Sequence, residues 1–435
     1  MWYLVSIVVL LLAMILELEL LVYAMYSLLG VLLLSRFLAR EWIENVSAKR
    51  ECSRLTAQIG DDVAVIVDVK NEGSLPVPWL LLEDALPKSA LLQRPPRIKV
   101  NKRRMAITQL KSRGQMTMLY QVTFLMRGYY QLGPLLVESG DLFGLHRRYR
   151  TLTSPHFVLV FPKVLPLEGY DFSSRRPIGE IRLTHRLFED PTRISGVRPF
   201  QNGDPLNRIH WRATARTGDL YCKTYDASSV AGATFILDFH RDSYSPRSEP
   251  SCSELAVTAV ASLANVVYQM GQQIGLVTNG RDAADRIREE GISHEFVSRD
   301  TAQANTGMRD VSTRLRPFEV ETRRGADQLT RILETLARVE MTDGLTFPTL
   351  LTEAAARLTR DATVVAVLPY VSAETAIALG NLRRGGYAVS AIVVMYKDHP
   401  EYSDCLGRLV AEGLDVRSIQ DELSLSAVCA AQVLR

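Results

Sequence analysis

Side chains that could carry out chemistry are concentrated between Gly196 and Asp226, in the stretch "GVRPFQNGDPLNRIHWRATARTGDLYCKTYD". Three features stand out: the arginines Arg208, Arg212 and Arg216 at even spacing, the pair His210-Trp211, and a Gly-Asp-Pro turn. Catalysis is the least favoured use of this stretch. It has no carboxylate pair, and a lone histidine is more often structural than a general base. No glycine-rich phosphate loop precedes it either.

A helix would bring the three arginines together. Asp204 followed by Pro205 is typical of a helix N-cap and first helical position. Gly218 is typical of the residue that ends a helix. A helix between them would place the arginines on one face, four residues apart. The following residues, "DLYCKTYD", alternate as a strand does.

Such an arginine stripe requires acidic groups nearby. Like charges four residues apart on an exposed helix repel by a few tenths of a kcal/mol, and arginine forms paired hydrogen bonds with carboxylates. We expect Arg198 and Arg216 to find acids within the chain. We expect Arg208 and Arg212 to find them on a partner.

The elements around this stretch indicate several domains. Residues 52–162 alternate as β-strands do, for example in "DDVAVIVDVKNEG", and predict an Ig-like β-sandwich. From about residue 230, apolar strands such as Ala233–Asp238 alternate with helical segments such as Cys252–Met270. This alternation predicts an α/β domain with a mostly parallel sheet.

The first 35 residues are almost entirely apolar. Two runs, Trp2–Leu16 and Leu18–Ser35, flank Glu17 and Glu19. Each run reaches roughly 24 Å as a helix, short for a bilayer core of about 30 Å. A single long helix would bury the glutamates near the bilayer centre, which is costly. We therefore expect a transmembrane hairpin across residues 2–35, with the glutamates at its turn; the alternative is a buried helix pair in a soluble fold.

Charge and cysteine content narrow the cellular setting. Basic residues directly after the hairpin place that side in the cytoplasm by the positive-inside rule. The five cysteines are scattered, with no C-x-x-C pair, which indicates reduced thiols. The net charge of +3 does not suggest nucleic-acid binding. We expect a multi-pass protein of the inner (cytoplasmic) membrane with its soluble domains in the cytoplasm.

The stretch from Gly196 closely resembles the signature of the bacterial domain of unknown function 58 family. That signature reads Gly-x-Arg-x-Tyr/Phe, then Gly-Asp-x-x-Arg-x-Ile-Asp/His-Trp-Lys/Arg-x-x-Ala-Arg. The matching positions are Gly196, Arg198, Phe200, Gly203, Asp204, Arg208, Ile209, His210, Trp211, Arg212, Ala215 and Arg216. The upstream "RGYYQLGPLLVESGDLFGL" is also similar, with Leu142 in place of the usual proline.

The resemblance implies a membrane hairpin, a β-sandwich and a doubly wound von Willebrand factor A-like domain. It also implies association with MoxR-type AAA+ ATPases and transglutaminase-like membrane proteins. On this basis the domains are a hairpin (1–50), a sandwich (51–165), a connector carrying the signature (166–229) and the A-like domain (230–435).

The A-like domain of the resemblance often binds a divalent cation such as Mg²⁺ through hard oxygen ligands. Here Asp238 is retained, His240 and Asp242 replace two serines, and Thr346 stands near the usual threonine. Pro369-Tyr370 occupies the place of the last aspartate. We expect a degenerate site without metal, and an altered site at Asp238, His240 and Asp242 is the alternative.

The resulting expectation is a membrane-anchored cytoplasmic adaptor without enzymatic activity. Its signature residues, Arg198, Asp204, Arg208, His210, Trp211, Arg212 and Arg216, would bind a partner or brace the fold. Two rivals stay open: metal-dependent hydrolysis at the altered cation site, and a purely architectural role.

Overall fold

The structure is a computed structural model. It describes residues 2–141, 144, 146–167, 194–200, 209–225, 232–284, 315–360, 362–396 and 399–425. The chain divides into two compact units. Unit 1 comprises Met1–Val164, Gly280–Leu315 and Leu333–Gly344, and unit 2 comprises Leu165–Asn279, Arg316–Ile332 and Leu345–Arg435.

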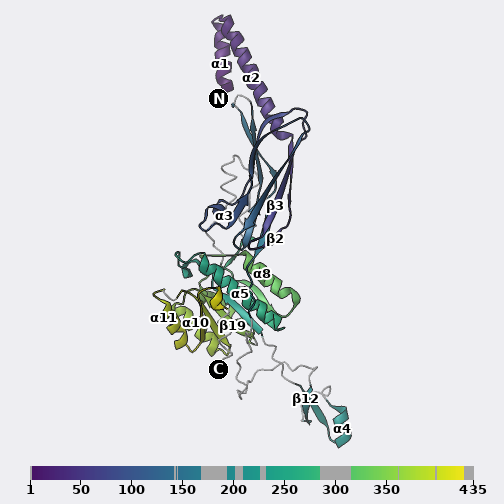
Figure 1. Cartoon of the computed structure of the whole chain (residues 1–435), viewed down its shortest axis with the longest axis vertical. Helices are drawn as coiled ribbons and strands as arrows, with labels where there is room; N and C mark the ends of the chain where they lie inside the picture. Colours follow the sequence, from purple (N-terminus) through teal and green to yellow (C-terminus); the bar gives the residue numbers. More distant parts are fainter. Residues whose placement is uncertain are drawn as a thin grey trace. The chain divides into compact units, whose positions relative to one another are not determined.

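Unit 1 begins with the expected helical hairpin, drawn in purple in Figure 1. Helix α1 spans Trp2–Ile15 and packs against α2, which spans Glu19–Glu44. Glu17 lies in the turn with a left-handed φ of 52°, and Glu19 opens α2. Helix α2 is longer than its apolar run, because it continues nine residues beyond Ser35 to Glu44.

The two ends of α2 have different surroundings. Toward its N-terminus apolar side chains are exposed, including Leu20 at 88% and Tyr23 at 73%. Toward its C-terminus, Trp42 and Ile43 are buried in the core of the following β-sheets. By length and composition α2 could cross a membrane, as core helices and signal sequences also could. One continuous helix therefore connects an exposed apolar segment to a packed core.

Three β-sheets follow in unit 1, with strand orders β1-β3-β7-β5, β10-β9-β4-β6 and β2-β11-β8. Their strands are β1 (Val46–Cys52), β2 (Thr56–Gln58), β3 (Asp62–Asn71), β4 (Val77–Asp84), β5 (Ile98–Asn101), β6 (Met105–Leu110), β7 (Gln115–Phe124), β8 (Gly128–Leu132), β9 (Leu135–Gly140), β10 (Arg147–Thr153) and β11 (His156–Phe161). A short helix, α3 (Lys88–Leu92), precedes β5. A two-stranded pair, β16 (Arg281–Asp282) with β18 (Val339–Glu340), completes the unit.

The alternation read from the sequence decides which residues of β3 enter the core. Val63, Val65, Val67 and Val69 are fully buried, whereas the residues between them are more exposed. This two-residue period is that of a strand with one packed face.

A buried ion pair lies within this core. The side chains of Arg50 and Asp84 are both inaccessible to solvent and are bound to each other. Arg50 also donates to the carbonyls of Leu132 and Ser154. Tyr120 donates its hydroxyl to Asp84 at 2.6 Å, and burial raises the pKa of Tyr120. The pair is therefore well hydrogen-bonded, as a buried charge must be.

Unit 2 contains a six-stranded sheet with the order β17-β15-β14-β19-β20-β21, in which every pairing is parallel except β15 with β17. The strands are β14 (Gly232–Leu237), β15 (Gln273–Thr278), β17 (Phe318–Arg323), β19 (Ala362–Leu368), β20 (Val389–Val394) and β21 (Asp415–Ile419). The predicted strand Ala233–Asp238 is confirmed to within one residue as β14.

Helices cover both faces of this sheet. Helix α5 (Ser251–Gln269) packs against β14, β15, β19 and β20. On the other face, alternate strand residues such as Ile236, Val364 and Val393 share a core with three helices. These are α9 (Phe347–Ala354), α10 (Ala373–Arg384) and α11 (Tyr402–Ala411). Helix α8 (Ala326–Arg338) follows β17.

Candidate functional site

The signature segment forms a small module of two strands and one helix, labelled β12 and α4 in Figure 1. Strand β12 (Ile194–Pro199) pairs antiparallel with β13 (Tyr221–Tyr225), and α4 spans Trp211–Thr217. We call the described residues of this segment, 194–200 and 209–225, the signature module. Ile209 and Cys222 form a β-bridge and are both buried.

The predicted helix start was wrong, whereas its end is confirmed. The helix begins at Trp211 instead of directly after Asp204, because Ile209 is held in the bridge to Cys222. His210 is the N-cap, and its Nδ1 accepts a hydrogen bond from the Ala213 amide at 3.0 Å. Gly218 ends the helix with a left-handed φ of 82°.

The late start of α4 divides the arginine stripe. Arg212 and Arg216 lie on the helix, four residues apart, whereas position 208 precedes its first residue. Asp204 and Arg208 fall outside the described residues. Arg198 lies on β12, where it is half-buried and donates to the carbonyl of Pro199.

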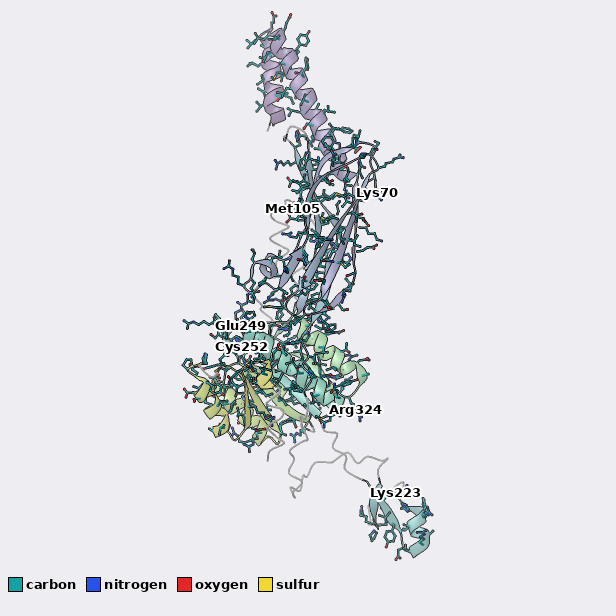
Figure 2. All side chains as sticks on the ribbon, in the orientation of Figure 1. Lys70, Met105, Lys223, Glu249, Cys252 and Arg324 are labelled. Atoms are coloured by element: carbon teal, nitrogen blue, oxygen red, sulfur yellow. The ribbon has the colours of Figure 1, made fainter. Side chains whose placement is uncertain are left out.

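Exposed side chains of two kinds cover the signature module. Trp211 is 69% exposed, and Val197 and Leu220 are 45% and 44% exposed. Arg212 and Arg216 are exposed as well, and within the described residues neither forms an ion pair. Lys223, labelled in Figure 2, is half-buried and adds a further cation. Tryptophan and arginine are the residues most enriched at binding hot spots.

A second group of predicted residues lies at the carboxyl end of the six-stranded sheet. Strand β14 pairs with β15 on one side and β19 on the other, so the connections diverge there. In open α/β sheets ligands bind at such a divergence. Asp238 follows β14 directly and is buried, and its backbone amide donates to Val367 of β19.

Asn279 connects the loops at this edge, and the sequence reasoning missed it. Its amide nitrogen donates to Asp238 at 2.8 Å and to the carbonyl of Leu345 at 2.9 Å. Its oxygen accepts from the amide of Phe239 at 2.6 Å. The position directly after an apolar strand was the available signal, but nothing in the local sequence identifies its partners.

The side chains that the sequence suggests as cation ligands take part in hydrogen bonds within the chain. His240 caps a short 3-10 turn, and its Nδ1 accepts from the Asp242 amide at 3.2 Å. Thr346 is the N-cap of α9, and its hydroxyl lies 3.0 Å from that of Thr349. In the part of the chain that the structure describes, no three histidine, cysteine, aspartate or glutamate side chains form a metal-binding group. Burial raises the pKa of Asp238, while the hydrogen bonds from Asn279 and His240 oppose that change.

The upstream motif "RGYYQLGP" supplies another residue whose role was missed. Arg127 is buried and donates to the carbonyls of Leu336 at 2.7 Å and Val339 at 2.9 Å, both in unit 1. Tyr130 donates to the carbonyls of Met126 and Arg127, and its ring lies where a Cβ on Gly128 would be. The motif thus positions a cation at the carbonyl end of α8, where the helix dipole favours it.

Two described residues near the end of that motif, Asp141 and His146, are hydrogen-bonded to each other. Asp141 accepts from the His146 amide at 2.6 Å, and its own amide donates to the His146 carbonyl. His146 Nδ1 lies 3.0 Å from the Ser35 hydroxyl. Ser35 is the position at which the apolar run of α2 ends.

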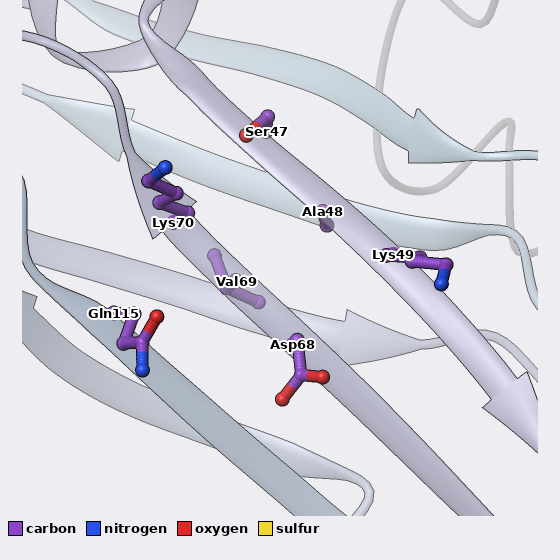
Figure 3. Close-up of a pocket in the computed structure, with 7 residues that line it drawn as sticks. All are labelled: Ser47, Ala48, Lys49, Asp68, Val69, Lys70 and Gln115. Carbon is purple, nitrogen blue, oxygen red and sulfur yellow. The ribbon is translucent and has the colours of Figure 1, made fainter.

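A shallow hollow lies on the exposed face of β1, β3 and β7 (Figure 3). Lys49, Asp68, Lys70 and Gln115 surround it. Lys49 pairs with Glu51, and Asp68 accepts from Thr117, so two of the three charged side chains around the hollow are bound to neighbours on the same sheet. We therefore do not place the functional site here.

The four described cysteines, Cys52, Cys222, Cys252 and Cys405, are free thiols. Burial raises the pKa of Cys52, Cys252 and Cys405, which disfavours the reactive thiolate at neutral pH.

Residues 196–304 match the family described as "Protein of unknown function DUF58". The chain is also 22% identical over 274 residues to the uncharacterised protein YeaD of Bacillus subtilis strain 168. That alignment covers 62% of this chain and 65% of YeaD, somewhat less than two thirds of the relative's length.

Two solved structures with partial similarity illustrate the range of matches. A von Willebrand factor type A protein from Catenulispora acidiphila is 15% identical and covers 49% of this chain and 43% of its own, with a TM-score of 0.28. The CARDB domain of PF1109 from Pyrococcus furiosus is 14% identical and covers 27% of this chain and 94% of its own, with a TM-score of 0.18. At these TM-scores the description of the fold rests on the strand order observed in this chain.

Proposed function

We propose that this chain is a membrane-anchored cytoplasmic adaptor that binds a protein partner through the signature module. The observation that carries the proposal is the exposure of Trp211 beside Arg212 and Arg216 on α4. Among the described residues, neither arginine has an acidic partner. A partner protein with an acidic surface could pair with these arginines, and an apolar contact on the same surface could bind the exposed tryptophan. The resemblance suggests a MoxR-type AAA+ ATPase as that partner, working with transglutaminase-like membrane proteins.

The N-terminal hairpin supports the membrane part of the proposal. The exposed apolar side chains of α1 and α2 would be stable in lipid but unfavourable in water. Helix α2, at about 1.5 Å per residue, is roughly 39 Å long and exceeds the bilayer core of about 30 Å. Arg36 and Arg40 follow the apolar run, which favours the cytoplasm on that side.

The unit 2 sheet suits an adaptor better than a metal hydrolase. We infer a von Willebrand factor A-like, doubly wound domain in which hydrogen bonds between Asn279 and residues 238 and 239 fix the loop after β14. Support for this comes from the strand order and from the helices on both faces.

Co-purification from detergent extracts of the native membrane tests the proposal. The tagged wild-type chain should recover a MoxR-type ATPase, and the double variant Trp211→Ala/Arg212→Glu should recover about tenfold less, because both the apolar anchor and a cation are lost. Arg324→Glu, a charge reversal at an exposed arginine outside the signature module (labelled in Figure 2), is the matched control and should recover wild-type amounts. Equal recovery by all three proteins would count against the module as the binding surface.

A further inference from the structure

A second surface of unusual charge lies on the β-sheets of unit 1. Between Asp84 and Glu138 the sequence has no acidic residue but ten basic ones, although the whole chain has a net charge of only +3. Strand β6 lies in the middle of this segment. The segment runs through strands of all three sheets, so the charge near β6 comes from the cations at the two ends of that strand.

Strand β6 is the last strand of its sheet. In the order β10-β9-β4-β6, it pairs with β4 and, among the described strands, with no other. The antiparallel register runs from Glu83↔Met105 to Val77↔Leu110. An edge strand carries backbone groups on its outer side that can pair with an added strand.

Exposed cations stand at both ends of β6. Lys102 and Arg103 precede it, and Lys111 and Arg113 follow it; all four are exposed. Arg104 differs, because it pairs with the largely buried Glu83 at 3.2 Å. The four exposed cations therefore form two pairs separated by a strand of six residues, which is about 20 Å long.

Between the cations, β6 exposes an apolar side chain. Ile107 is 76% exposed, whereas the neighbouring Ala106 and Thr108 are half-buried. Figure 2 marks the start of the strand at Met105. A strand with a large apolar residue in the open and charges at its ends can hold an extended peptide by backbone pairing and side-chain contact.

The charges at the two ends of β6 indicate which kind of strand can bind along its free edge. Two copies of this chain pairing antiparallel along β6 would place Lys102 and Arg103 against Lys111 and Arg113, so like charges would meet. Cations at an edge also discourage self-association in general. An acidic strand meets no such repulsion and gains attraction at both ends.

We propose that the β6 edge binds an acidic, extended segment of a protein partner as an added antiparallel or parallel strand. Acidic side chains at the two ends of that segment lie against Lys102–Arg103 and Lys111–Arg113. A β-branched or aliphatic residue at its centre contacts Ile107. This surface is separate from the signature module and does not depend on the adaptor function proposed above.

The binding test uses the full-length chain in nonionic detergent and a fluorescent nine-residue peptide. The probe alternates valine and threonine between Glu-Asp and Asp-Glu ends, and its anisotropy is followed as the chain is added. We expect saturable binding that weakens as salt is raised. A peptide with lysine and arginine in place of the acids should not bind. A third peptide keeps the acidic ends but has proline at alternate central positions, and it should bind at least about tenfold more weakly because proline lacks the amide for strand pairing.

Two double variants locate the surface. Lys102→Glu/Arg103→Glu should weaken binding of the acidic probe by at least about tenfold. Lys49→Glu/Lys70→Glu makes the same change in net charge around the hollow of Figure 3 and should leave binding unchanged. Thermal unfolding of both variants checks that the fold is retained, and Ile107→Asp provides an independent variant at an exposed position.

Three results would overturn the proposal. The first is equal weakening by both double variants, which would show attraction to the overall charge only. The second is equal binding of the valine and proline peptides, which would exclude strand addition. The third is dimerisation of the chain that is abolished by Ile107→Asp, since it would make a second copy the occupant.

Discussion

Individual side chains of the signature module act largely through backbone groups. His210 accepts from the Ala213 amide, and Thr214 accepts from the Tyr221 amide at 3.1 Å. The pattern that this stretch resembles has aspartate or histidine at position 210. Both side chains can accept a hydrogen bond from the third amide of a helix, so capping explains why the two alternate. His210 is thus the N-cap of α4 and directly precedes the exposed Trp211.

Replacing His210 tests this capping role. His210→Ala should destabilise α4 by about 1 kcal/mol, since the Ala213 amide loses its side-chain acceptor. Hydrogen exchange of the α4 amides should accelerate accordingly. His210→Asn keeps an acceptor and should exchange close to the wild-type rate. Identical exchange in the alanine and asparagine variants would contradict the assignment.

The buried carboxyl of Asp238 predicts a dependence of stability on pH. Burial raises its pKa above the ordinary value of 3.8, so the folded chain holds this proton more tightly than the unfolded chain. Unfolding therefore releases a proton between the two pKa values, and the contribution of Asp238 to the free energy of unfolding falls as the pH rises through that interval.

Asp238→Asn removes this titration while keeping an oxygen that can accept from Asn279 and the His240 amide. The variant should gain stability relative to wild type as the pH is raised from about 4 toward neutrality. Denaturant unfolding followed at several pH values provides the comparison. A stability difference that is independent of pH would show that Asp238 titrates normally.

At the scale of elements, the sequence predicted the strands and helices with the clearest hydrophobic period, because that period carries the information. The helix predicted at Cys252–Met270, which is α5, and the alternating valines of β3 are confirmed. The start of α4 was not predictable, because Asp204-Pro205 is a strong local signal, whereas the bridge from Ile209 to Cys222 is a tertiary pairing.

The residues that connect distant loops were missed for the same reason. Asn279 binds Asp238, which is 41 positions away, and Arg127 binds carbonyls more than 200 positions away. Contacts between residues so far apart in the chain produce no periodic pattern in a single sequence. Asp238 lies at the carboxyl edge of the sheet, as its position after an apolar strand predicts. The hydrogen-bond partners of the candidate cation ligands could not be predicted from the sequence.

Helix α2 predicts where the chain can be truncated. Its last turns bury Trp42 and Ile43 in the core of unit 1, whereas its first turns are exposed and apolar. A chain that begins at Arg36 should remain folded and be released from membranes. A chain that begins at Val46 loses both core side chains and should lose at least about 3 kcal/mol of stability.

Circular dichroism and thermal unfolding of the two truncated chains provide the measurement. Equal stability would show that α2 is dispensable for the core. Retention of the longer truncated chain in membrane pellets would show instead that the hairpin is not the membrane anchor.

At the scale of the whole molecule, one chain contains a β-rich unit that begins with an apolar hairpin and a second unit built on an α/β sheet. Polar groups that could serve chemistry at the α/β sheet edge are bound to one another, as Asp238 is to Asn279. Exposed apolar and cationic groups instead lie on surfaces, at the signature module and along β6. This distribution supports the proposal that the chain binds partners through exposed surfaces.

Photo-crosslinking in intact cells tests the central claim most directly. Benzoylphenylalanine placed at position 211 would replace the exposed tryptophan, and the same residue at Tyr396, which is 44% exposed in unit 2, is the control. The account predicts that the chain labelled at position 211 forms a covalent adduct with a MoxR-type AAA+ ATPase, and that the control forms none. The account would be contradicted if position 211 yielded no adduct, or if both positions yielded the same adducts in equal amounts.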